Sequence, residues 1–197
     1  MQVAIMSINF ADFKLYHGNC LEVLKQIPNE SVQCCITSPP YFGLRDYGTD
    51  EQIGFEETPD EYINKLVNVF REIKRILKND GTLWVNIGDS YGQNFRWGGD
   101  ETASKKQKGN RGTVGFMGTK NNKNIQPKNL IGVPWKLAFA LQTDGWILRQ
   151  DIIWYKPAPM PESVKDRCTR SHEYIFLLTK KPHYYYDYEA IQEDCVG

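Results

Sequence analysis

Two adjacent prolines follow an apolar segment and limit how the chain can fold around them. Residues 31–36, SVQCCI, have the apolar, β-rich character of a buried strand. Pro39 and Pro40 lack the backbone N–H that a central strand donates, so this strand must end at Thr37. Ligands of open α/β sheets bind at the carboxyl ends of the strands. The segment 38–41, SPPY, is therefore predicted to form a stiff rim beside a ligand.

Segments typical of strands and helices alternate along the chain. Thr58 is a predicted helix N-cap, with Pro59 at the first helical position and Glu61 three residues after the cap. The segment 79–81, NDG, is predicted to close that helix. The alternation favours an α/β fold with a mostly parallel sheet. The predicted strands are 13–17, 31–37, 82–87, 146–155 and 173–179, and the predicted helices are 21–27, 58–77 and 133–141.

Composition is that of a globular protein, and the simplest interpretation is one domain over residues 1–197. The formal net charge is zero, so no overall field draws the chain to nucleic acid or to a membrane. The five cysteines include no C-x-x-C spacing, which favours reduced thiols in the cytoplasm. The sequence predicts no metal site, no secretory signal and no membrane-spanning segment.

Residues 92–128 differ from the rest of the chain in composition. They are rich in Gly, Asn and Lys, with eight basic and two acidic side chains and almost no apolar periodicity. We predict a mobile basic insertion that contacts the phosphates of DNA. A solvated surface loop without a partner is the alternative.

The rim residues suit a reaction at the exocyclic amine of a nucleic-acid base. Such an amine is a poor nucleophile, because its lone pair is delocalised into the ring. The Ser38 hydroxyl and the Pro39 carbonyl could accept its two N–H bonds, and the Tyr41 ring could stack on a base that has left the duplex. Positioning would then supply most of the rate. The alternative for this segment is a strand-terminating turn with no further role.

Four sequence blocks, in this order, resemble the β-class of S-adenosylmethionine-dependent DNA amino-methyltransferases. The resemblance extends from about Phe13 to about Asp194, outside the insertion. It implies a Rossmann-like methyltransferase sheet with helices on both faces. The blocks are LYHGNCLE at 15–22, TSPPY with GLRDYG at 37–48, GTLWVNIGD at 81–89, and DIIWYKP through PES at 151–163, completed by SHEY at 171–174.

The resemblance assigns roles to individual residues. It implies that Ser38, Pro39, Pro40 and Tyr41 are catalytic and hold the target base and its amine. The cofactor S-adenosylmethionine would lie near Asn19, Cys20, Thr37 and Ser38, although Asn19-Cys20 stands where the family commonly has Gly-Asp. Tyr41, Arg45, Lys156, Pro157 and His172 would bind the substrate base or DNA. Two alternatives stay open, namely an Arg45–Asp46 surface pair and a buried structural pair of His172 with Glu173.

Three functions are compatible with these assignments. A serine before Pro-Pro-Tyr favours methylation of cytosine N4 in double-stranded DNA, whereas aspartate there favours adenine N6. The alternatives are a non-catalytic remnant or subunit that binds DNA or a partner chain, and an adenine-N6 methyltransferase. Restriction–modification, phage protection and regulation are all possible biological roles.

The resemblance breaks at one block. Members of the class carry a glycine-rich cofactor loop, typically Asp-Pro-Phe-x-Gly-x-Gly, on the first strand of the sheet, and no such block follows the motifs seen here. In the family's strand order, two strands from that part separate the strand near Leu15 from the strand ending at Thr37. We therefore predict an incomplete sheet that is rearranged, or completed by a second copy or another chain.

Overall fold

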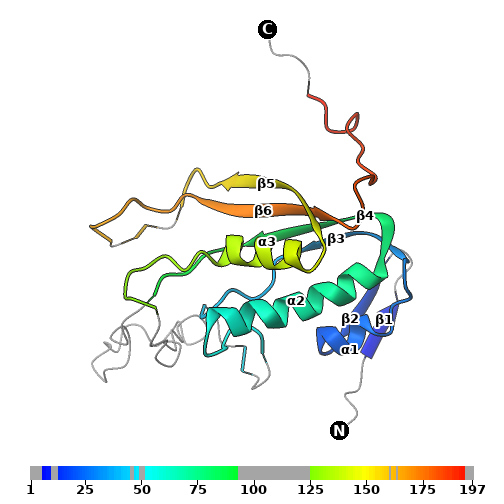
Figure 1. The fold of residues 1–197 in the computed structure, drawn as a ribbon, viewed down its shortest axis with the longest axis horizontal. Helices are drawn as coiled ribbons and strands as arrows, with labels where there is room; N and C mark the ends of the chain where they lie inside the picture. The colour runs from blue at the N-terminus through cyan, green and yellow to red at the C-terminus, as the bar shows by residue number, and fades with distance from the viewer. Residues whose placement is uncertain are drawn as a thin grey trace.

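The computed structural model shows an α/β arrangement in which two helices pack on a mixed β-sheet (Figure 1). It describes residues 6–9, 13–44, 47–48, 52–92, 125–159, 161–162 and 164–193. The predicted Arg45 and almost all of the basic insertion lie outside these residues. The elements are β1 (Met6–Asn9), β2 (Lys14–His17), α1 (Cys20–Leu24), β3 (Val32–Thr37), α2 (Pro59–Ile76), β4 (Leu77–Ile87), α3 (Val133–Thr143), β5 (Ile147–Tyr155) and β6 (His172–Thr179).

Helix α2 begins where its sequence predicts. The Thr58 hydroxyl oxygen accepts a hydrogen bond from the Glu61 N–H at 3.1 Å, and the Glu61 carboxylate accepts one from the Thr58 N–H at 3.3 Å. This reciprocal capping box satisfies N–H groups that the first turn leaves unpaired. The position of α2 matters for the site, because its first turn lies beside the 38–41 rim.

The end of α2 differs from the prediction. The segment 79–81 does not separate helix from strand, because β4 starts at Leu77, directly after the helix. These residues instead form an irregularity, where the register of β3 with β4 shifts between Val32 and Cys34. A Cβ on Gly81 would lie 2.9 Å from the Gln33 carbonyl oxygen, so only glycine fits this close approach.

The four-stranded sheet has the order β3-β4-β6-β5. Strands β3, β4 and β5 run in the same direction, and β6 runs antiparallel to both of its neighbours. The sheet is therefore mixed: three of its four strands are parallel in direction, as predicted, and β6 is the exception. A parallel return needs a crossover, usually a helix. The proline-stiffened link after β5 has no helix in its described residues, so the chain returns antiparallel.

Strand β2 confirms the predicted strand near Leu15, but it lies outside the main sheet. It pairs antiparallel with β1, which the sequence did not predict, in a separate two-stranded sheet. Strand β3 is consequently an edge of the four-stranded sheet. This arrangement agrees with the predicted incomplete sheet.

The hydrophobic core lies between α2, α3 and one face of the sheet (Figure 1). Leu83, Val85 and Ile87 point into it from β4 and are fully buried. Strand alternation sends Ile36 and Trp154 to the opposite face, where they are 81% and 50% exposed. The α/β sheet is confirmed, and within the described residues its helices pack on one face only. No helix in this part of the chain is long and apolar enough to cross a membrane.

Candidate active site

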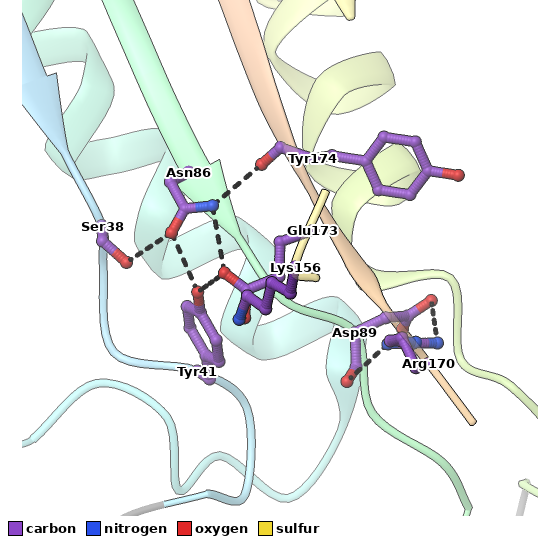
Figure 2. A network of polar contacts seen from close by, with 8 residues as sticks. All are labelled: Ser38, Tyr41, Asn86, Asp89, Lys156, Arg170, Glu173 and Tyr174. Carbon is purple, nitrogen blue, oxygen red and sulfur yellow. Dashed lines mark hydrogen bonds and ion pairs between the residues drawn. The ribbon is translucent and has the colours of Figure 1, made fainter. Parts of the chain in front are cut away.

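A polar network lies at the end of the sheet where β3 and β4 terminate (Figure 2). Ser38 follows β3, Asn86 belongs to the end of β4, and Glu173 belongs to the start of β6. Lys156 directly follows β5, and Tyr41 enters from the proline-rich rim. The strand topology thus brings five side chains from distant parts of the sequence to one edge of the sheet.

Asn86 is the centre of this network, and its partners fix the orientation of its amide. Its Nδ2 donates to Glu173 Oε2 at 3.2 Å and to the Tyr174 carbonyl at 3.2 Å. Both partners are acceptors, so the opposite amide orientation would place two oxygens against them. Oδ1 of Asn86 therefore faces the hydroxyls of Ser38 and Tyr41, at 3.3 and 3.1 Å.

This orientation determines the role of the Ser38 hydroxyl. A hydroxyl has one proton to donate and two lone pairs that accept. Because Ser38 donates its hydroxyl hydrogen to Asn86 Oδ1, this contact uses neither of its lone pairs. This geometry leaves the Ser38 oxygen able to accept a further hydrogen bond.

Glu173 is an ionised carboxylate held by three donors. Its Oε1 forms an ion pair with the Lys156 ammonium, and its Oε2 accepts from Tyr41 Oη at 3.0 Å and from Asn86. Partial burial raises the pKa of Glu173, but the hydrogen bonds from Lys156, Tyr41 and Asn86 outweigh that effect and lower it overall. Glu173 therefore carries a negative charge in the network at neutral pH.

Tyr41 is locked into the network by its hydroxyl and its ring. Burial raises its pKa to about 12, so the phenol stays protonated and donates at neutral pH. The ring lies against Gly88, where an added Cβ would approach Tyr41 Cε2 to 2.5 Å. One face of the ring is thus occupied by backbone, and the other is the face on which a base could stack.

A second cluster joins the site to α3. Asp89 Oδ1 accepts hydrogen bonds from the backbone N–H groups of Ser90 at 2.9 Å and Val133 at 2.8 Å. Val133 is the first residue of α3, whose N-cap Gly132 has no side chain to do this. Arg170 donates to the Asp89 carbonyl at 3.2 Å, so the link after β5 is tied to the same point (Figure 2).

The structure brings some of the predicted site residues together. Ser38, Tyr41 and Lys156 meet in the network, and Pro39 and Pro40 form the rim between them. Their roles in binding or catalysis stay predictions.

Other predicted residues lie apart from this network. His172 points to the face of β6 opposite Glu173, with its ring 5.3 Å from that of Tyr174, so the alternative His172–Glu173 pair does not form. Pro157 follows Lys156 without joining the network in the described residues.

The four predicted cofactor residues are not gathered into one site. Thr37 ends β3 and Ser38 follows it, beside the network. Asn19 caps α1, accepting a hydrogen bond from the Leu21 N–H, and Cys20 is the first residue of that helix. Helix α1 meets the C-terminal end of α2, where Arg75 donates to the Leu24 carbonyl at 2.7 Å. The rim instead meets the N-terminal end of α2, so the described residues alone do not assemble the predicted cofactor site.

Sequence reasoning did not identify Asn86. The signal for it is an amide within an otherwise apolar strand, WVNI, which has no obvious role in a buried sheet. For Glu173, the sequence indicates a role only together with His172. Neither residue could be linked to Ser38 without the strand order.

Comparison with known proteins agrees with this architecture. The family described as DNA methylase, covering N6 and N4 enzymes, matches residues 32–195. The chain is 54% identical over 180 residues to Type II methyltransferase M.Cfr9I of Citrobacter freundii, covering 91% of this chain and 58% of the relative. It is 51% identical to Type II methyltransferase M.SmaI of Serratia marcescens, covering 94% and 62%.

Solved structures show the same fold. PvuII DNA methyltransferase (cytosine-N4-specific) superimposes with a TM-score of 0.61 at 17% identity, over 89% of this chain and 52% of that one. TTHA0409 of Thermus thermophilus, a putative DNA modification methylase complexed with S-adenosyl-L-methionine, gives 0.56 at 21% identity, over 88% and 55%. The chain spans about three fifths of the length of these two curated relatives. With most of its residues matched by the family and half of them identical to those of the relatives, the chain belongs to the N6/N4 DNA methylase family.

Proposed function

We propose that this chain forms the part of a DNA amino-methyltransferase that holds the target base, and that the enzyme methylates the exocyclic N4 of cytosine. The orientation of the Ser38 hydroxyl carries this proposal. Asn86 Oδ1 accepts a hydrogen bond from the Ser38 hydroxyl at 3.3 Å, so the serine oxygen is available to the substrate as an acceptor. An amine that must be activated through its N–H bonds needs such an acceptor.

The proposed mechanism rests on positioning. The flipped base stacks on the face of the Tyr41 ring opposite Gly88, while Ser38 and the Pro39 carbonyl accept the two N–H bonds of its amine. Pulled toward these acceptors, the N–H bonds leave the ring plane, and the nitrogen lone pair becomes available for attack. S-adenosylmethionine would supply the methyl group: its S–CH3 bond would break as the N–CH3 bond forms, S-adenosylhomocysteine would leave, and the nitrogen would release one proton to solvent. The network behind Ser38 keeps the acceptors in place, and such preorganisation supplies much of the rate.

Cytosine is preferred over adenine as the substrate because the first residue of the rim is serine. A neutral hydroxyl, rather than a carboxylate, meets the amine here. Adenine N6 is the second candidate, since its amine presents the same two N–H bonds. Identification of the methylated nucleoside in treated DNA by mass spectrometry separates the two.

The cofactor site is proposed to include Thr37 and Ser38 from this end of the sheet and Asn19 and Cys20 from α1. Lys156, Pro157, His172 and Arg45 are proposed to line the path of the base or the DNA. Arg45 lies outside the described residues. The four described cysteines are unpaired, which supports the predicted cytoplasmic location.

Further polypeptide is proposed to complete the sheet. Strand β3 forms an edge, and Ile36 on it is 81% exposed. The occupant is a second copy of this chain or another chain that adds strands beside β3. The competing function, a DNA-binding or partner-binding subunit without catalysis, predicts no cofactor binding at all.

Calorimetric titration of S-adenosylmethionine into the 197-residue chain is the first test. Saturable binding supports the enzyme, and its absence, even after a completing chain is added, supports the non-catalytic subunit. Methyl transfer to duplex DNA is then compared between the wild type and Ser38→Ala. We expect the substitution to remove most transfer and to leave the unfolding transition unchanged. Ser31→Ala, just before β3, is the matched control, and near-normal transfer by Ser38→Ala would exclude Ser38 from the mechanism.

A further inference from the structure

The backbone carbonyl groups of residues 39–42 differ in whether they accept a hydrogen bond from the protein. Tyr62 Oη donates to the Pro40 carbonyl at 2.7 Å, and the Leu44 N–H donates to the Tyr41 carbonyl at 3.3 Å. The next carbonyl, of Phe42, accepts from Ser90 Oγ at 2.9 Å. Within the described residues, Pro39 has the one carbonyl from 39 to 42 without a donor. That carbonyl is the one left for a ligand.

Tyr62 holds the Pro40 carbonyl from within the hydrophobic core. It lies in the first turns of α2, its side chain is fully buried, and its ring contacts Phe42 with 5.4 Å between centroids. A buried hydroxyl needs a partner, and the Pro40 carbonyl is the partner it has. The helix thereby fixes the peptide between Pro40 and Tyr41.

Fixing that peptide also fixes its neighbours. The proline ring limits φ of Pro40, so ψ is the main remaining freedom between the Pro39 carbonyl and the Tyr41 backbone. A hydrogen bond from Tyr62 to the Pro40 carbonyl selects one value of this ψ. The direction of the Pro39 carbonyl and the entry of the Tyr41 ring onto Gly88 then follow from it.

We infer that Tyr62 is a positioning residue for methyl transfer, which turns the Pro40 carbonyl into the core and so directs the Pro39 carbonyl toward the substrate amine. The inference rests on the proposed function for its kinetic consequence, but not for its structural consequence, the direction of the Pro40 carbonyl.

Glu56 also supports the loop that follows the rim. Its carboxylate accepts from the Gly54 N–H at 2.9 Å, and the Gly54 carbonyl accepts from the Gly43 N–H at 2.7 Å.

The sequence allows the Pro40 carbonyl to be observed by NMR at a single site. Pro40–Tyr41 is the one Pro–Tyr step in the chain. Protein labelled with carbonyl-¹³C proline and ¹⁵N tyrosine therefore gives one cross-peak in an HNCO spectrum, and this peak reports the Pro40 carbonyl. We expect Tyr62→Phe to shift or broaden this peak, because the carbonyl loses its donor while the ring stays in place.

Val67→Ala is the matched control, since Val67 is a buried residue of the same helix that does not contact the rim through a hydrogen bond. It should lower stability and leave the cross-peak in place. An unchanged cross-peak in Tyr62→Phe, or an equal change in Val67→Ala, would overturn the inference.

Kinetics test the consequence for the reaction. Where the wild type transfers methyl groups, Tyr62→Phe should lower kcat by on the order of 10- to 100-fold, the usual effect of a small misplacement, with little change in KM for the methyl donor. Unchanged kcat would contradict a positioning role. If the wild type shows no transfer even with a completing chain present, the proposed function fails, and the cross-peak alone decides the inference on Tyr62.

Discussion

Ser38 and Asn86 lie 48 residues apart in the sequence, and their side chains meet at 3.3 Å. The register of the two parallel strands accounts for this contact. Thr37 pairs with Val85 at the end of the β3–β4 pairing. The residues that follow them, Ser38 and Asn86, therefore lie at the same level. A slip of one residue would send Asn86 to the opposite face. The chemistry of the rim therefore depends on the β3–β4 register.

Asn86→Asp should damage both stability and activity. The substitution preserves shape but replaces the donor to Glu173 by a carboxylate oxygen at about the same 3.2 Å. We expect the free energy of unfolding to fall by about 1–3 kcal/mol at neutral pH. We also expect most of the methyl transfer to be lost. Repulsion raises the pKa of the paired carboxylates, so the stability penalty should shrink as the pH falls and one of them takes up a proton.

Urea unfolding at pH 7 and pH 5 measures this penalty. Asn64→Asp, at an exposed position on α2, is the control and should change stability little at either pH. Equal losses for Asn86→Asp at both pH values would contradict the proposed pairing with Glu173.

Gly88→Ala should displace the ring of Tyr41. The new Cβ would lie 2.5 Å from Tyr41 Cε2, closer than any real contact, so the ring or the strand end must move. We expect overpacking to lower the free energy of unfolding by about 1–3 kcal/mol. We expect the displaced ring, as a second effect, to lose its stacking on the target base. Fluorescence of 2-aminopurine at the target position of a DNA duplex would report the second effect. If Gly88→Ala kept both the stability and the fluorescence of the wild type, the Tyr41 ring could move without cost and the prediction would be wrong.

Glu173→Gln tests the charge in the network. The pKa of Glu173 is below its ordinary value of 4.5, so its ionised form stabilises the folded chain above that pH. This contribution is lost as the pH falls through the lowered folded-state pKa. The stability difference between wild type and Glu173→Gln should therefore be constant from about pH 8 to pH 5 and shrink below about pH 4.5.

Denaturant unfolding across this pH range measures the difference. Glu189→Gln, at an exposed position near the C-terminus, is the control and should show no comparable trend. A difference that grows on acidification would mean that the folded state raises the pKa of Glu173.

The sequence predicted the parts of the site that rest on local chemistry. Thr58, Pro59 and Glu61 define the start of α2, and the two prolines define the end of β3, because these effects act over a few residues. Asn86 and Glu173 could not be found in this way. Their importance comes from the order β3-β4-β6, and the antiparallel return of β6 depends on a link with no helix in its described residues rather than on any pattern within the strand. The same limit applies to Tyr62, whose hydroxyl is hidden within an ordinary amphipathic helix.

The exposed face of the sheet gives the last prediction. Ile36 is 81% exposed on the edge strand β3, and Trp154 on β5 is 50% exposed on the same face. Burying such side chains stabilises by about 1.5–3 kcal/mol each, so the isolated 197-residue chain should associate with itself or with a completing chain. Ile36→Lys should weaken this association by roughly 10-fold or more, as measured by sedimentation velocity. Ile191→Lys replaces an isoleucine of similar exposure (62%) in the C-terminal segment and should have no such effect. A wild-type chain that stays monomeric at about 100 μM, a concentration at which a contact worth only some 5.5 kcal/mol would already be half formed, would show that this face does not bind a second copy of the chain.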